Sequence, residues 1–187
     1  MYIPYAAYSR PSPVSFLTSP PAHWDMRVNP HRAFSDVDID YAKMTPATQP
    51  PASSIPVQVL VTTPEFVLPW SLLIKPGQRR DHYGLSNPYA MDLKDIVTID
   101  DVLQGVYKAL SQSFPEPEWS SLPSEQWRQL TYASYKARYR ALPEGSQKRR
   151  REKGENVKRV DTLCGMHWFG GLMMGADGQI YLVARNL

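Results

Sequence analysis

Proline constrains this chain more than any other residue type, because it recurs throughout the first 55 residues. Proline has no backbone N–H and a fixed φ angle, so it ends regular helices and is excluded from central strands. The prolines of this stretch are Pro4, Pro11, Pro13, Pro20, Pro21, Pro30, Pro46, Pro50 and Pro51. The pattern predicts extended segments and turns without a regular helix over residues 1–55.

Aromatic and apolar residues interrupt the prolines at intervals. Trp24, Met26 and Val28 alternate with charged residues, which is typical of a short edge strand. We therefore expect a proline-rich arm over residues 1–22 and a single domain over residues 23–187.

The remaining segments show the periodicities of strands and helices. Val57, Val59 and Val61 alternate in a first strand over 57–63, and a second strand is expected over 70–75, with Pro64, Pro69 and Pro76 at the strand ends. A capping sequence at Thr98 predicts a helix that ends near Leu110, before Pro115 and Pro117. A second helix is predicted from Ser124 to about Leu142, and its expected inward residues are Trp127, Leu130, Ala133, Ala137 and Ala141.

The C-terminal segments, 166–173 and 179–185, are apolar runs joined by a turn that contains Asp177-Gly178, which is a strong hairpin signal. Gly170-Gly171 indicates a bulge or a close backbone approach within the first run. Strands followed by two helices and a hairpin predict an α+β domain. We expect a mainly antiparallel sheet with the two helices on one face.

The net charge and the cysteine content exclude a secreted protein held together by disulfide bonds, but they exclude few other classes of protein. The net charge is +3, the pI is about 8.9, and Cys164 is the one cysteine, so an intramolecular disulfide cannot form. No apolar run reaches the length of a membrane-spanning helix, and the N-terminus does not resemble a signal peptide. A cytoplasmic location, or a nuclear one, is the expectation.

Residues 159–171 contain the densest set of chemical groups. A cysteine nucleophile needs a histidine beside it, but Cys164 and His167 would point to opposite faces of a strand. We therefore predict no catalytic residues, no metal site and no cofactor, and whether the protein is an enzyme stays open with the balance against it. The candidate binding residues are Arg159, Asp161, His167 and Trp168.

A basic run falls in the polar loop at about residues 143–157. Its members are Lys148, Arg149, Arg150, Arg151 and Lys153. A solvated loop is the favoured interpretation, and a nuclear-import signal or a contact with the phosphate backbone of RNA or DNA through residues 148–159 are the alternatives.

Several sequence blocks together resemble a family of unknown function that is abundant in mushroom-forming fungi. The blocks span about residues 22–187 and include Trp24-Asp25-Met26, Ala47-Thr48-Gln49-Pro50-Pro51, 68–74, 97–103, 132–138, 157–163 and 167–172. The chain departs from the family pattern at Thr162, where the family commonly has an aromatic residue, and in the basic loop at 146–153. The resemblance implies a fungal intracellular protein of one domain and supplies no activity. Arg159 and Asp161 could pair with each other or with Arg138, or line a small polar site.

Three functional hypotheses remain. The leading one is a non-catalytic protein-interaction module, which would bind another protein or a second copy of itself. The second is an enzyme or small-ligand-binding protein with a site near Asp161, Cys164, His167 and Trp168. The third is binding of nucleic acid through residues 148–159. No membrane partner is expected.

Overall fold

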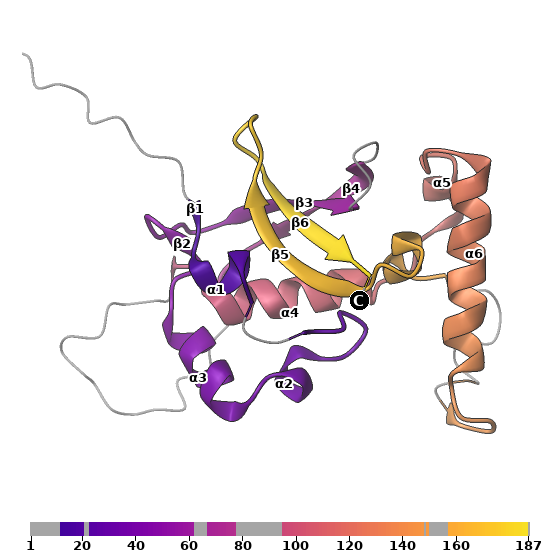
Figure 1. The fold of residues 1–187 in the computed structure, drawn as a ribbon, viewed down its shortest axis with the longest axis horizontal. Helices are drawn as coiled ribbons and strands as arrows, with labels where there is room; N and C mark the ends of the chain where they lie inside the picture. Colours follow the sequence, from indigo (N-terminus) through magenta and orange to yellow (C-terminus); the bar gives the residue numbers. More distant parts are fainter. Residues whose placement is uncertain are drawn as a thin grey trace, which may run out of the picture.

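A computed structural model describes residues 12–20, 23–61, 67–77, 95–147, 149 and 157–186. Figure 1 shows the arrangement of its elements. In chain order these are β1 (Ser12–Pro13), α1 (Ser15–Thr18), α2 (Pro30–Ala33), α3 (Asp36–Met44), β2 (Thr48–Gln49), β3 (Ile55–Val61), β4 (Val67–Ile74), α4 (Ile99–Leu110), α5 (Glu116–Trp119), α6 (Glu125–Arg140), the 3-10 helix η2 (Arg159–Leu163), β5 (Trp168–Met174) and β6 (Ile180–Arg185).

The main sheet has the strand order β4-β3-β6-β5. Its pairs are antiparallel except for the parallel pair of β3 and β6, and β1 and β2 form a separate antiparallel ribbon. The predicted C-terminal hairpin is β5–β6, and Gly178 of its turn has a φ of 77°, which favours glycine. The fold is therefore mixed α+β with a mainly antiparallel sheet, as the sequence predicts.

Helix α4 covers one face of the sheet, and Figure 1 shows it running alongside the strands. Thr98 and Asp101 form a full capping box at its start, which confirms the predicted helix. Val102, Val106 and Leu110 are completely buried on its inner side. A Cβ atom on Gly105 would lie 3.2 Å from the side chain of Ile74, so the helix approaches β4 closely at this point.

Helix α6 has the predicted extent but a different inner face. Its buried residues are Trp127, Thr131 and Tyr135. Trp127 is buried as predicted, but the rest of the predicted inner stripe is wrong, because Leu130 is 43% exposed and Ala133, Ala137 and Ala141 are exposed as well. Trp127, Thr131 and Tyr135 are spaced four residues apart and therefore lie on nearly the same side of α6. This side faces η2. The indole Nε1 of Trp127 donates a hydrogen bond to the carbonyl oxygen of Thr162 at 3.0 Å.

The prediction that residues 1–55 contain no regular helix is wrong. Helix α3 occupies a window without proline, begins after Ser35 as its N-cap and ends before Pro46. Pro30 stands at the first position of α2, where proline is tolerated. Pro69 lies within β4 and does not bound it, which an edge strand permits.

The segment expected to be an edge strand forms a single bridge. Asp25 pairs with Trp168 at the edge of β5, and the chain then turns. Leu17 of α1 is fully buried against the same part of the sheet. Among the described residues, no helix combines the length and apolar character that a membrane crossing would require.

Candidate functional site

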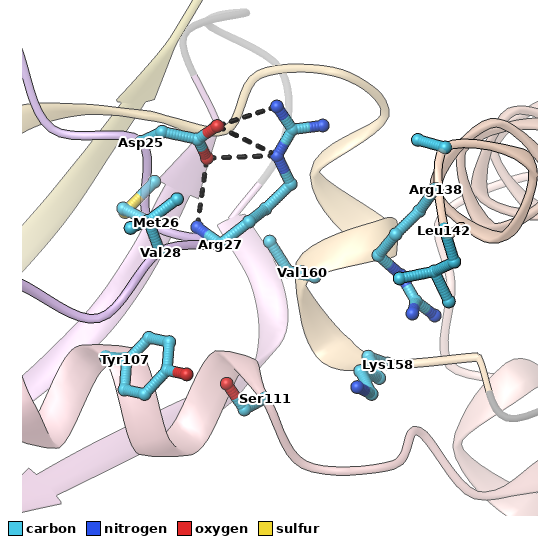
Figure 2. A pocket seen from close by; sticks show the side chains of 11 residues that line it. Asp25, Met26, Arg27, Val28, Tyr107, Ser111, Arg138, Leu142, Lys158 and Val160 are labelled. Atoms are coloured by element: carbon cyan, nitrogen blue, oxygen red, sulfur yellow. Dashed lines mark hydrogen bonds and ion pairs between the residues drawn. The ribbon is translucent and has the colours of Figure 1, made fainter. Parts of the chain in front are cut away.

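A cavity of about 390 Å³ opens between four segments that are far apart in the sequence. These segments are the turn at residues 25–28, the C-terminal part of α4, the end of α6 and η2. Figure 2 shows the side chains of these segments arranged around the opening. We call this space the basic cavity, because it is lined by Arg27, Arg138 and Lys158.

The turn on one side of the basic cavity is fixed by backbone hydrogen bonds to β5. The N–H of Met26 donates to the carbonyl oxygen of His167, and the N–H of Phe169 donates to that of Trp24. The buried indole of Trp24 donates in turn to the carbonyl oxygen of Val28 at 2.8 Å, which closes the turn. Asp25 and Arg27 are therefore held by a rigid segment.

Asp25 and Arg27 form an ion pair at the edge of the cavity. The guanidinium Nη2 and Nε of Arg27 donate to the carboxylate at 2.6 and 3.0–3.1 Å, and the backbone N–H of Arg27 donates at 3.0 Å. Burial alone would raise the pKa of Asp25, but these hydrogen bonds and the charge of Arg27 outweigh it and hold the pKa below its ordinary value. Asp25 is thus an ionised acceptor at neutral pH.

A second ion pair lies on the opposite side. The Nε and Nη2 of Arg138 donate to the two carboxylate oxygens of Asp161, each at 2.8 Å, and the backbone N–H of Lys158 donates to the same carboxylate at 2.8 Å. The Asp161 side chain is only 3% exposed. One buried carboxylate therefore holds both Arg138 of α6 and the backbone that carries Lys158.

The remaining lining is partly apolar and partly hydroxyl. Figure 2 shows Tyr107 and Ser111 along α4, with Val160 projecting from η2 between the two basic sides. Met26, Val28 and Leu142 add apolar surface. A smaller cavity of about 290 Å³ adjoins at Arg27, Val28 and Tyr107, and it adds Arg32 and Asn29. The surroundings would suit a ligand that carries both an apolar part and a polar group.

Positive charge exceeds negative charge across the two cavities. The described lining residues include Arg27, Arg32, Arg138 and Lys158, opposed by Asp25 in the lining and by Asp161 behind it. The described lining contains neither cysteine nor histidine. Such a set can bind an anion through charge-assisted hydrogen bonds, but it offers no nucleophile with an adjacent base.

The structure separates the four predicted binding residues. Asp161 lies behind the basic cavity and pairs with Arg138, which confirms one of the pairings that the sequence allowed. Arg159 points elsewhere, with its guanidinium 5.3 Å from the ring centre of Trp70 and its Nη2 3.5 Å from Glu118. His167 and Trp168 lie side by side next to Asp25, with ring centres 5.7 Å apart.

Cys164 and His167 interact with different residues, as expected from the sequence, although Cys164 lies at the end of η2 and not on a strand. The thiol contacts Thr131 at 3.7 Å and the carbonyl oxygen of Thr162 at 3.5 Å. Burial raises the pKa of Cys164 to about 11, and the charge of Asp161 adds to this effect. The thiol is protonated at neutral pH and is a poor nucleophile.

Burial also lowers the pKa of His167, together with the charge of Arg27, against the opposing effect of Asp25. The imidazole is therefore predominantly neutral at neutral pH. Within the described part of the chain, no group of His, Cys, Asp and Glu could hold a metal ion.

Most of the basic run lies outside the described residues, namely Lys148, Arg150, Arg151 and Lys153. Arg149 is described, and its guanidinium lies 5.1 Å from the ring centre of Tyr139 and 3.4 Å from Glu144. Binding of RNA or DNA through residues 148–159 stays a prediction.

Sequence reasoning missed the residues that line the basic cavity. Asp25, Arg138 and Lys158 each fall within blocks that carry the family resemblance, but nothing in their spacing predicts that they meet. The N-terminal turn and η2 are more than a hundred residues apart, so only the fold brings them together.

The model of a family of unknown function (DUF6699) matches residues 22–179 of the chain. No curated protein and no solved structure matches this chain.

Proposed function

The chain belongs to the family of unknown function DUF6699, and from its basic cavity we propose that it is a non-catalytic protein that binds a small anionic ligand. The single observation that carries this proposal is the convergence of Arg27, Arg138 and Lys158 from three separate segments on one cavity. Asp25 and Asp161 pair with Arg27 and Arg138 and offset part of this positive charge, so a bound anion would offset the excess.

The cavity favours a carboxylate or phosphate group attached to an apolar body. Cationic side chains bind such groups through charge-assisted hydrogen bonds, and Tyr107 and Ser111 can contribute hydroxyl groups. Val28, Leu142 and Val160 would contact the apolar part. The volume of about 390 Å³ falls in the usual range for small-molecule sites.

Binding without catalysis fits the protonation states of the nearby groups. Asp25 is held ionised by Arg27, so it cannot act as a general acid near neutral pH. Cys164 contacts Thr131 and Thr162 and does not line the cavity. The proposal therefore retains only the small-ligand-binding form of the second hypothesis, at a site that Asp161 supports from behind and that Cys164, His167 and Trp168 do not line.

Isothermal titration calorimetry with phenyl phosphate and phenylacetate tests the proposal, with phenylacetamide as the neutral counterpart of phenylacetate. We expect saturable binding of the anions and none of the amide. Lys158→Met should weaken binding by about tenfold or more, because a hydrogen bond to a charged group contributes roughly 1.5–3 kcal/mol.

Lys136→Met is the matched control, because Lys136 is an exposed lysine of α6 outside the cavity. This variant should bind as the unmodified protein does. Absence of saturable binding of both anions, or equal weakening by the two lysine variants, would rule out the basic cavity as the binding site.

We also propose that the protein comes from a mushroom-forming fungus and acts in the cytoplasm or nucleus. The sequence blocks described above support the source, and the single cysteine supports a reducing compartment. Microscopy of a fluorescent fusion expressed in such a fungus tests the location, and a signal confined to the secretory pathway would contradict it.

A further inference from the structure

A groove separates the edge strand β4 from helix α4. It shares no lining residue with the basic cavity, although its Gln112 and Arg159 are chain neighbours of Ser111 and Lys158. It has a volume of about 280 Å³. Its strand side is the continuous run from Ser71 to Ile74, and its helix side includes Lys108, Ala109 and Gln112. The groove therefore follows the strand and is not a round pocket.

The backbone of β4 is available for further pairing within the described part of the chain. The strand pairs with β3 on one side, and the sheet order places it at the edge. Alternate N–H and C=O groups of an edge strand point away from its neighbour, which makes it a template for an added strand. Pro69 lacks an N–H, but the run from Ser71 to Ile74 has no proline.

Among the described residues, the proline and the irregular pairing that protect this edge lie in the first half of β4, at Pro69 and opposite Gln58–Leu60, and not along Ser71–Ile74. Leu73 is 60% exposed and Ser71 is also exposed, while Leu72 and Ile74 face the core. At Gly105 the helix lies close against Ile74, and this contact limits the groove at one end. The space along Ser71–Leu73 is accordingly bounded by strand on one side and helix on the other.

The other end of the groove is basic, and buried polar atoms lie there without hydrogen-bond partners among the described residues. Arg159 lines the groove and stacks on Trp70, while its Nη1 donates to Gln112 at 3.1 Å. The Nε of Arg159, the Nε1 of Trp70 and the Oε2 of the neighbouring Glu118 are buried without a hydrogen-bond partner among the described residues. Lys108 adds a second cation, against one carboxylate, Glu118, at 3.5 Å from Arg159.

We propose that this groove binds an extended acidic segment of a partner protein, which pairs with β4 as an additional strand. The edge backbone supplies sequence-independent hydrogen bonds, as in other complexes formed by strand addition. Lys108 and Arg159 select a segment with a carboxylate side chain at this end. The proposal gives a site to the protein-interaction hypothesis and does not depend on the basic cavity.

The experiment uses an array of octapeptides in which valine and threonine alternate and a pair of positions carries glutamate, glutamine or lysine. The full-length protein should retain the glutamate peptides in preference to the others. The affinity of a retained peptide is then measured by fluorescence polarisation. Lys108→Glu should weaken binding by about tenfold, because it replaces an attractive charge with a repulsive one.

Lys136→Glu makes the same charge change on the exposed side of α6 and should leave the affinity unchanged. Lys108 is also exposed, so its replacement should leave the fold intact. Hydrogen exchange measured by mass spectrometry should show slower exchange of the β4 amides when a peptide is bound. Lys158→Met should not affect peptide binding, which separates this site from the basic cavity.

Retention that ignores peptide charge, or no retained octapeptide, would overturn the proposal. Unchanged exchange in β4 with peptide bound would also overturn it, because strand addition must protect that edge. Dimerisation of the protein through β4, in competition with the peptides, would instead assign the groove to a second copy of the chain and refute an acidic partner.

Discussion

Replacement of Asp161 by asparagine should destabilise the fold strongly. The carboxylate is 3% exposed and the Arg138 side chain is 13% exposed. Both oxygens accept hydrogen bonds from Arg138, and one also accepts from the backbone N–H of Lys158. Asparagine has nearly the same volume, so the change removes the negative charge and one acceptor without opening a cavity.

The expected magnitude follows from the burial of the pair. Removing one partner of a buried ion pair leaves an uncompensated charge and typically costs about 3–5 kcal/mol. Asparagine retains one carbonyl acceptor, so we expect a loss near the lower value, about 3 kcal/mol. The matched change Asp25→Asn affects a pair whose arginine is 41% exposed, and it should cost about 1 kcal/mol or less.

Urea unfolding followed by tryptophan fluorescence measures both losses, provided that the slope of the unfolding free energy with urea is unchanged. The double variant Asp161→Asn with Arg138→Met should lose less stability than the sum of the single variants, because no unpaired charge remains buried. A loss below about 1 kcal/mol for Asp161→Asn, or equal losses at Asp161 and Asp25, would refute the reasoning.

The other predictions concern a glycine, a histidine and the cysteine. Gly171→Ala should cost about 2 kcal/mol or more in thermal unfolding, since its φ is 109° and a Cβ would lie 2.8 Å from the carbonyl oxygen of Leu17; Gly165→Ala, with φ 94° and open space, should cost less. The pKa of His167 is lower in the folded protein, so the unfolded chain binds a proton first as the pH falls. The contribution of His167 to the free energy of unfolding is therefore present above about pH 6.5 and is lost as the pH falls below it. In urea unfolding, the His167→Gln variant should lose less stability between pH 7.5 and pH 5 than the unmodified protein does. Alkylation of Cys164 by iodoacetamide at pH 8 should be about a hundredfold slower in the folded protein than in urea, because its pKa rises to about 11, and a similar rate in both states would contradict this.

The local patterns that predicted the fold were those with a short-range physical cause. The capping box at Thr98 and the Asp177-Gly178 turn depend only on neighbouring residues, and both elements form as expected. Helix α3 is not predicted when the proline content is considered over all of the first 55 residues together. Its own window from Asp36 to Met44 contains no proline and follows a serine cap.

The inner face of α6 could not be predicted from apolar periodicity alone. The buried Thr131 contacts the thiol of Cys164, and the buried Tyr135 lies beside the guanidinium of Arg138. These side chains face η2, which buries both apolar and polar residues and whose position depends on the whole fold. The apolar periodicity predicts burial of the alanine-rich side of α6, but the surface of η2 determines which side of the helix is covered.

The basic cavity was beyond prediction for the same reason, but its chemistry follows once the segments meet. Asp161 fixes the guanidinium of Arg138 and also neutralises much of its charge. Arg138 would therefore contribute more to orienting an anion than to attracting it, whereas Lys158 binds Asp161 through its backbone N–H, a bond that a change of its side chain retains. Loss of Arg138 must disturb folding and binding together. The exchange of Lys158 for methionine is consequently the cleaner measure of anion binding, since it leaves the buried ion pair in place.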